Sequence, residues 1–104
     1  MTTWHEPKRQ ANLALHGLDF AGCERIWDGF TITREDRRAH YGEVRLVCFG
    51  VIDTSHVVLV YTERPTGPHI ISLRKAVKHE IAYYRKIAHQ ADARDPRSRQ
   101  SPLD

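Results

Sequence analysis

The sequence predicts an α+β domain in which helices lie against one antiparallel sheet of three to four strands. Two helical patterns come first, β-branched and aromatic runs between turn signals follow, and a last helical pattern closes the domain. A chain of 104 residues fits one domain with one modest core. We expect residues 1–90 to form this domain and the polar residues 91–104 to be a disordered tail.

Two helices are expected before the sheet. Pro7 suits the first turn of a helix and Gly17 suits its end, so residues 7–16 should form the first helix. Asp19 is a good N-cap for a second, short helix over residues 20–27, whose apolar side chains share one stripe.

The sheet is expected to be a meander. Residues 30–33 have strand character, and the charged residues 34–42 should form an exposed loop. Two longer strands, 43–52 and 56–62, are separated by a turn of hairpin composition. A further strand over residues 69–72 should pair with the second of them.

A closing helix is expected over about residues 75–89. The apolar positions that repeat at helical spacing, and that should pack on the sheet, are Val77, Ile81, Tyr84 and Ala88. This helix would put Arg74 and Lys75 where a buried strand becomes a helix, beside the unpaired N–H groups of the first helical turn. Such a junction suits a phosphate group.

Charge is unevenly distributed along the chain, although its formal net charge is only +3. Residues 44–90 carry seven basic and three acidic side chains, whereas residues 1–43 carry six and seven. This excess favours a polyanion or an acidic protein partner, and a solvated helix face is the alternative.

Several classes of protein are disfavoured. No apolar stretch is long enough to cross a bilayer and no signal peptide is recognisable, so we expect a cytoplasmic protein without membrane contact. Cys23 and Cys48 lack metal or redox spacing and should be small, reduced core residues. The seven histidines show no ligand spacing, so we expect no metal and no cofactor.

Several separated blocks identify a family. They are Trp4 to Arg9, Asn12 to Phe20, Gly42 to Arg45, Gly50, and Ile70 to Ala76 followed by Glu80. With these blocks in this order, the chain from about Trp4 to Tyr84 resembles the BrnT toxins of bacterial type II toxin-antitoxin systems, part of the RelE-like ribonuclease group. The resemblance implies a RelE-like fold, metal-free cleavage of RNA, and neutralisation by a BrnA-like antitoxin. Operator DNA would be reached only through that antitoxin.

The chain differs from many relatives at three positions of these blocks. His5, Leu15 and His69 stand where an aspartate, a lysine and an arginine are common. Two cations are lost and two imidazoles are gained, a change that could alter substrate preference or antitoxin contacts, or lower activity.

Metal-free RNA cleavage requires a base for the attacking 2′-OH, an acid for the leaving oxygen, and stabilisation of a dianionic phosphorane. Arg74 is the first candidate for the phosphate, because its planar fork matches two phosphate oxygens. A pair with Glu80 or a role in covering apolar surface is the alternative. Glu43 and Arg45 should share a strand face as general base and second clamp, or as an ordinary ion pair.

His79, one turn past Lys75, is the candidate general acid, with simple solvent exposure as the alternative. Candidate RNA contacts are Arg64, Ser72, Lys75 and Lys8, each of which could instead be an ordinary surface or backbone-bonding residue. The competing function is a non-catalytic, partner-binding subunit of a toxin-antitoxin-like regulator complex, whose basic surface holds an acidic antitoxin.

Overall fold

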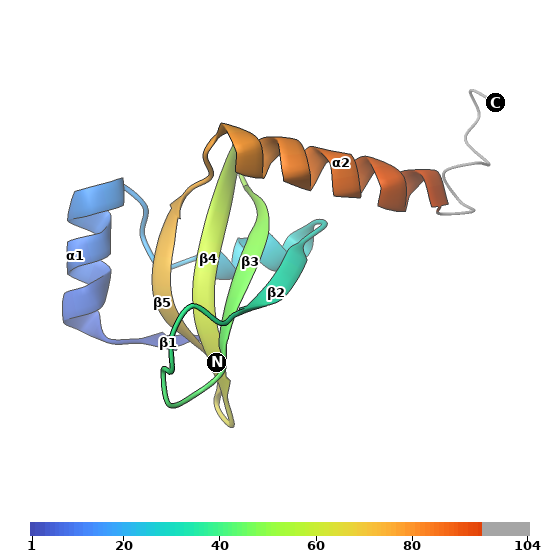
Figure 1. Ribbon diagram of the computed structural model, residues 1–104. Helices are drawn as coiled ribbons and strands as arrows, with labels where there is room; N and C mark the ends of the chain where they lie inside the picture. The colour runs from blue at the N-terminus through green and yellow to red at the C-terminus, as the bar shows by residue number, and fades with distance from the viewer. Residues whose placement is uncertain (95–104) are drawn as a thin grey trace.

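The structure, a computed structural model, describes residues 1–94 and contains one mixed sheet of five strands (Figure 1). Its elements are β1 (Thr3–Trp4), α1 (Glu6–His16), η1 (a 3₁₀ helix, Cys23–Asp28), β2 (Ile32–Asp36), β3 (Arg45–Ile52), β4 (Ser55–Arg64), β5 (Gly67–Lys75) and α2 (Lys78–Arg94). The strand order is β1-β5-β4-β3-β2, and β2 to β5 form the expected antiparallel meander. The predicted α+β class is therefore confirmed.

The number of strands and the second helix differ from the prediction. Strand β1 was not expected, because its two residues are too few to show an alternating pattern; it pairs in parallel with the edge of β5. The expected helix over residues 20–27 is instead a 3₁₀ helix that starts at Cys23. Only one α-helix, α1, therefore precedes the main strands.

Three strand boundaries change where candidate residues lie. Strand β2 continues to Asp36, so the predicted loop begins later; pairing with β3 outweighs the polarity of this edge strand. Strand β3 starts at Arg45, which leaves Glu43 in the preceding loop and not on the strand as expected. Strand β5 extends to Lys75, so Arg74 is a strand residue and α2 begins only at Lys78.

Helix α2 is longer than predicted and lies on the sheet through its first half, while the rest projects beyond the strands (Figure 1). It continues through Arg94, past the predicted end near residue 89, and residues 95–104 of the expected tail lie outside the described residues. Ile81 and Tyr84 are partly buried as expected, but Val77 is 49% exposed and precedes the helix. None of the helices in residues 1–94 is long and apolar enough to cross a membrane.

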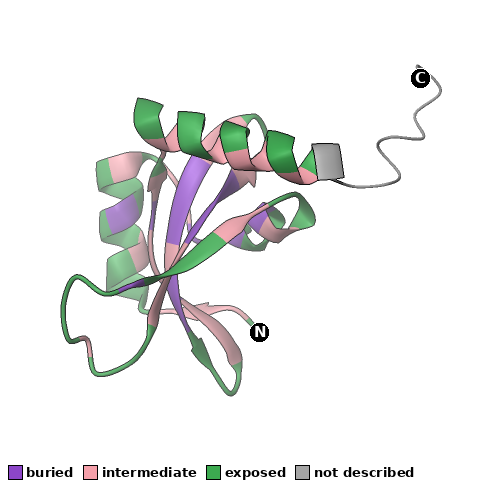
Figure 2. Cartoon of the chain, turned by 45° about the vertical axis from the view of Figure 1, so that its right-hand side comes forward, coloured by how far each residue is buried: buried purple, intermediate pink, exposed green. Residues whose placement is uncertain are grey.

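The core lies between one face of the sheet and the segment around η1. Phe20, Cys23 and Ile26 pack there against strand residues that include Cys48 and Leu59, and all five are fully buried. Figure 2 shows the same distribution, with buried residues concentrated in the strands while both α-helices are largely exposed. Both cysteines are free and buried, which confirms their expected role as core residues.

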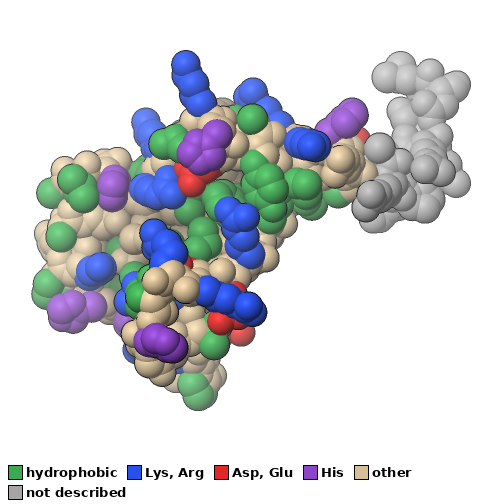
Figure 3. Space-filling view, viewed as in Figure 1, with side chains coloured by type: hydrophobic (Ala, Val, Ile, Leu, Met, Phe, Trp, Pro, Cys, Tyr) green, Lys and Arg blue, Asp and Glu red, His purple; other side chains and the backbone are tan. Residues whose placement is uncertain are grey.

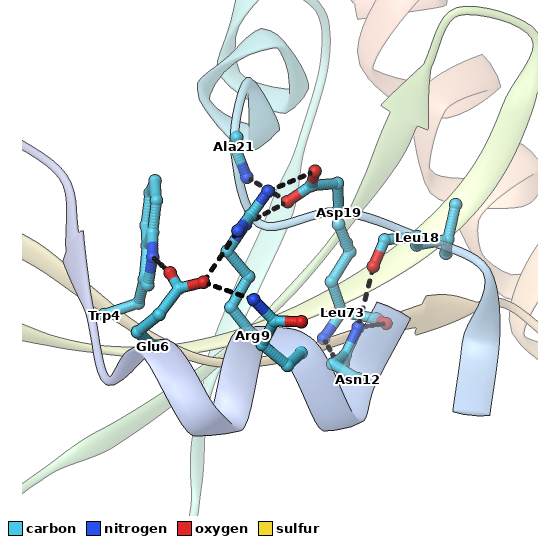
Figure 4. A network of polar contacts seen from close by, with 9 residues as sticks. Trp4, Glu6, Arg9, Asn12, Leu18, Asp19, Ala21 and Leu73 are labelled. Carbon is cyan, nitrogen blue, oxygen red and sulfur yellow. Dashed lines mark hydrogen bonds and ion pairs between the residues drawn. The ribbon is translucent and has the colours of Figure 1, made fainter. Parts of the chain in front are cut away.

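Helix α1 closes the edge of β5 through one side chain. The Asn12 amide accepts a hydrogen bond of 3.1 Å from the backbone N–H of Leu73 and donates one of 2.7 Å to the carbonyl of the same residue (Figure 4). Asn12 thereby occupies the hydrogen-bonding groups that a neighbouring strand would otherwise take. The same helix is fixed by Arg9, whose guanidinium donates to both carboxylate oxygens of Asp19 at 2.7 and 2.9 Å.

Candidate nucleic-acid interface

The sheet face opposite the core is hollowed and lined by arginines. Four apolar strand residues form its floor: Val47, Phe49, Val58 and Val60. Ser72 and Arg74 line it from β5, Glu80 from the first turn of α2, and Arg34 and Arg38 from β2 and the following loop. The hollow measures about 340 Å³. Figure 3 shows this face, where Lys and Arg side chains gather around an apolar strip below α2.

Arg74 is held by a carboxylate across the turn between β5 and α2. Its Nη1 and Nη2 donate to Oε1 and Oε2 of Glu80, each at 2.8 Å. Mainly because of these hydrogen bonds, the pKa of Glu80 falls to about 2, although burial opposes the shift. In the unbound protein Arg74 is therefore paired with Glu80, which is the alternative role that the sequence left open for this arginine.

The start of α2 is also occupied by Glu80. Its Oε1 accepts the backbone N–H of Val77 at 2.9 Å, as a capping side chain does. The phosphate site expected at this strand-to-helix junction is thus filled by a carboxylate of the chain itself. An anion that binds Arg74 must therefore share the Arg74 guanidinium with Glu80, or it must approach the guanidinium from the side on which Ser72 lies.

A second arginine-carboxylate pair lies across the hollow. Arg38 donates through Nε and Nη2 to the two carboxylate oxygens of Asp36, each at 2.8 Å. The Asp36 side chain is only 2% exposed, and its pKa falls to about 2 chiefly because of the bonds from Arg38. No sequence pattern indicates this pair, since residues 34–38 are all charged and have no regular period.

Arg34 is a second lining residue that no sequence pattern indicates. Its guanidinium carbon lies 5.1 Å from the ring centre of Phe49 and 5.3 Å from that of Tyr83. The two rings meet edge to face at 5.9 Å. Arg34 therefore stands at the rim of the hollow on two aromatic side chains, one from β3 and one from α2.

Three other candidate residues, Glu43, Arg45 and Arg64, form a separate group at the far end of this sheet face. Arg64 donates to Glu43 at 3.1 Å and is the main reason that the pKa of Glu43 is lowered. The guanidinium of Arg45 lies 3.8 Å from the ring centre of Tyr41, and its buried Nε has no hydrogen-bond partner among the described residues. The expected pairing of Glu43 with Arg45 is thus replaced by one with Arg64.

The register shows how far apart the two groups lie. Arg74 pairs with Val58 of β4, whereas Arg45 precedes Leu46, which pairs with Tyr61. Three residues of strand separate Val58 from Tyr61 and one more separates Leu46 from Arg45, which together correspond to about 13 Å along the strands. Arg74 and Arg45 also lie two strands apart, because β4 runs between β5 and β3. Since Glu80 holds Arg74 and the ring of Tyr41 supports Arg45, the two guanidinium groups belong to separate parts of this sheet face.

Three further candidates lie outside the hollow. Lys75 pairs with the core residue Val57 and therefore points to the other face of the sheet from Arg74. Lys8 is exposed on α1, at the sheet edge. His79 is exposed in the first turn of α2, where its charge contributes to the lowered pKa of Glu80.

Within residues 1–94, His, Cys, Asp and Glu side chains do not gather in groups of three or more that could hold a metal ion. A family model described as the ribonuclease toxin BrnT of type II toxin-antitoxin systems matches residues 4–80. Comparison with curated proteins gives no match. The matched range includes strands β2 to β5, Trp4 of β1, and the Arg74–Glu80 pair.

Proposed function

Because the chain belongs to the BrnT family of ribonuclease toxins of type II toxin-antitoxin systems, we propose that it is a metal-independent endoribonuclease that cleaves RNA on the hollowed face of its sheet. The observation that carries this proposal is the arginine-lined hollow itself, whose lining residues all lie within the matched range. Arginines remain charged at every physiological pH and can stabilise a phosphorane without a metal.

In the proposed reaction the 2′-OH of one nucleotide attacks the adjacent phosphorus and the 5′-oxygen of the next nucleotide leaves. A base takes the proton of the 2′-OH, and an acid gives a proton to the leaving oxygen. The products are a 2′,3′-cyclic phosphate and a free 5′-hydroxyl. We assign the scissile phosphate to Arg74, with Ser72 as a hydrogen-bond donor beside it and His79 as the general acid.

The group of Glu43, Arg45 and Arg64 would then hold the next part of the RNA strand. Arg45 suits a phosphate because its buried Nε is unsatisfied in the unbound protein, and an arginine donor left without a partner is costly. Glu43 remains the candidate general base if the scissile phosphate instead lies at this end. Lys8 and Lys75 are candidates for contacts outside the hollow.

Cleavage of a labelled RNA in excess EDTA tests the proposal. We expect the wild-type protein to cut, Arg74→Ala to lose at least a hundredfold in rate, and the control Arg25→Ala to cut normally, because Arg25 pairs with Asp53 on the other side of the sheet. A loss with Glu43→Gln as large as with Arg74→Ala would move the scissile phosphate to the Glu43 end. Absence of cleavage by the wild-type protein on varied RNAs, or equal cutting by Arg74→Ala, would overturn the assignment.

The family implies an antitoxin partner. We further propose that this partner is BrnA-like, binds the basic surface in the cytoplasm, and connects the toxin to operator DNA. The excess of cations in residues 44–90 supports a partner with an acidic binding segment. Co-expression with the neighbouring open reading frame should give a stable complex that does not cleave RNA, and failure of the two proteins to co-purify would contradict this part of the proposal.

A further inference from the structure

The cations that line the hollow differ in whether a carboxylate already holds them. Arg74 is bound to Glu80 and Arg38 to Asp36, each through two hydrogen bonds. Arg34 forms no ion pair and no hydrogen bond with a side chain among residues 1–94, and its guanidinium lies against two aromatic rings. Its donors are therefore free to meet an incoming anion.

The aromatic contacts fix where Arg34 stands. Phe49 is 3% exposed and packs in the sheet, so its ring gives the guanidinium a rigid support. Tyr83 adds a second ring from α2 and leaves part of its own surface open. An arginine restricted in this way loses less conformational freedom on binding an anion than a free surface arginine does.

The floor beneath Arg34 is apolar, which a phosphate alone would not need. Val47 and Val60 pair with each other across β3 and β4, are partly exposed, and offer an apolar surface within the hollow of about 340 Å³. Val58 lies beside them and is fully buried. A ligand that combines a flat apolar group with an adjacent anion matches this combination. An unpaired nucleotide has both features, whereas the bases of a duplex are stacked inside and cannot reach the floor.

We propose that the hollow binds one unpaired nucleotide of the RNA, with its base on the valine floor and its phosphate on Arg34, so that the protein selects single-stranded over double-stranded RNA. This inference rests on the proposed function for the identity of the ligand as RNA. The inference adds Arg34 as a substrate-binding residue at the rim of the hollow, across the floor from Arg74.

Binding of a fluorescent single-stranded RNA with 2′-O-methyl groups tests the inference, because this probe lacks the attacking hydroxyl and reports binding without cleavage. Arg34→Ala should weaken binding about tenfold, the effect of losing one charge-assisted hydrogen bond. It should also reduce the slope of log K against log salt by about 0.7, the value for one phosphate contact on a single strand. Arg34→Lys should retain the slope, and the control Arg25→Ala should match the wild-type protein.

A duplex of the same sequence should bind at least tenfold more weakly than the single strand. Equal binding by Arg34→Ala and the wild-type protein, or equal binding of duplex and single strand, would overturn the inference. So would an Arg34→Ala variant that loses the antitoxin while it keeps the RNA, since Arg34 would then belong to a protein interface. Thermal unfolding of each variant verifies that it is folded.

Cleavage of the unmodified RNA, measured in parallel, separates the two proposals. A protein that binds the probe through Arg34 but cuts no RNA would contradict the proposed function and leave the inference standing. A protein that cuts RNA but binds the probe equally well without Arg34 would contradict the inference alone.

Discussion

The guanidinium of Arg74 and the carboxylate of Glu80 face each other in parallel, joined by two hydrogen bonds of 2.8 Å. One residue belongs to β5 and the other to the first turn of α2, so the pair fixes the direction in which the helix leaves the sheet. Glu80 also caps the backbone N–H of Val77. A single carboxylate thus connects the candidate phosphate-binding arginine to the position of the helix.

This pair should make stability depend on acidity. The pKa of Glu80 is lowered to about 2 in the folded protein, below the value of about 4.3 for an unfolded chain. A lowered folded-state pKa stabilises the fold above the unfolded value, and this contribution is lost as the pH falls from about 4.3 to about 2. We expect Glu80→Gln to reduce the change in unfolding free energy between pH 7 and pH 2 by about 1 kcal/mol, since solvent weakens the interaction between Arg74 and Glu80.

Urea unfolding at a series of pH values from 7 to 2 measures the effect. Asp36 contributes a similar dependence in the same range, because its pKa is also lowered to about 2 by Arg38, so the Glu80→Gln variant should keep part of the slope. Glu24→Gln is a suitable control, as Glu24 is exposed in η1. A Glu80→Gln curve parallel to that of the wild-type protein would show that the pair does not stabilise the fold.

Gly50 should be intolerant of any side chain. A Cβ atom added there would lie 2.5 Å from Cγ1 of Ile26, which is fully buried under β3. Gly50→Ala should therefore lower the free energy of unfolding by about 1–3 kcal/mol through overpacking. Gly29→Ala is the matched control, because nothing lies within 4 Å of a Cβ at that position. Equal stability of the two variants in urea would contradict the packing described here.

Much of the meander could be predicted from the sequence, whereas the position of the site could not. The strands β3 and β4 carry long β-branched runs on both sides of a turn, and α1 is bounded by Pro7 and Gly17, so local patterns suffice for these elements. Strand β1 has two residues and depends wholly on β5 for its pairing. No local pattern can reveal such a strand.

The candidate site also depends on contacts between distant parts of the chain, which local sequence patterns do not reveal. The sequence leaves Arg74 either free for phosphate or paired with Glu80, because the choice depends on the path of the turn between β5 and α2. The sequence predicts that Arg34 lies in a loop. Only the pairing of β2 with β3 shows that Arg34 is a strand residue whose guanidinium lies over Phe49. The separation of Arg74 from Arg45 is likewise a property of the strand register.

Both cysteine thiols should be unreactive in the folded protein. Burial raises the pKa of Cys23 to about 12 and also raises that of Cys48, so almost no thiolate is present at pH 8. A disulfide-exchange reagent should therefore label neither residue at a measurable rate until the protein unfolds. Labelling in guanidinium chloride provides the control, and rapid modification of either thiol in buffer alone would contradict the burial of the core.

Asn12 should be the most sensitive position of α1. Replacing it with Ala leaves the buried N–H and carbonyl of Leu73 without partners, which should cost about 2 kcal/mol of unfolding free energy in urea. Leu15→Ala, at an exposed position of the same helix, should cost little. Equal losses from these two variants would mean that the amide does not hold the helix to the sheet.

Asn12→Asp distinguishes the two hydrogen bonds at this edge. A carboxylate can still accept the N–H of Leu73 but cannot donate to the carbonyls of Leu73 and Leu18, which it would repel. At pH 7 this variant should be less stable than Asn12→Ala, because an ionised group is buried beside two carbonyl oxygens. Burial and these carbonyls should raise the pKa of the new carboxyl above its unfolded value, so its cost relative to Asn12→Ala should shrink as the pH falls through that pKa and the group becomes a donor. Comparing the two variants in urea at pH 7 and pH 4 measures this change. A constant difference between them would show that Asn12 serves Leu73 only as an acceptor.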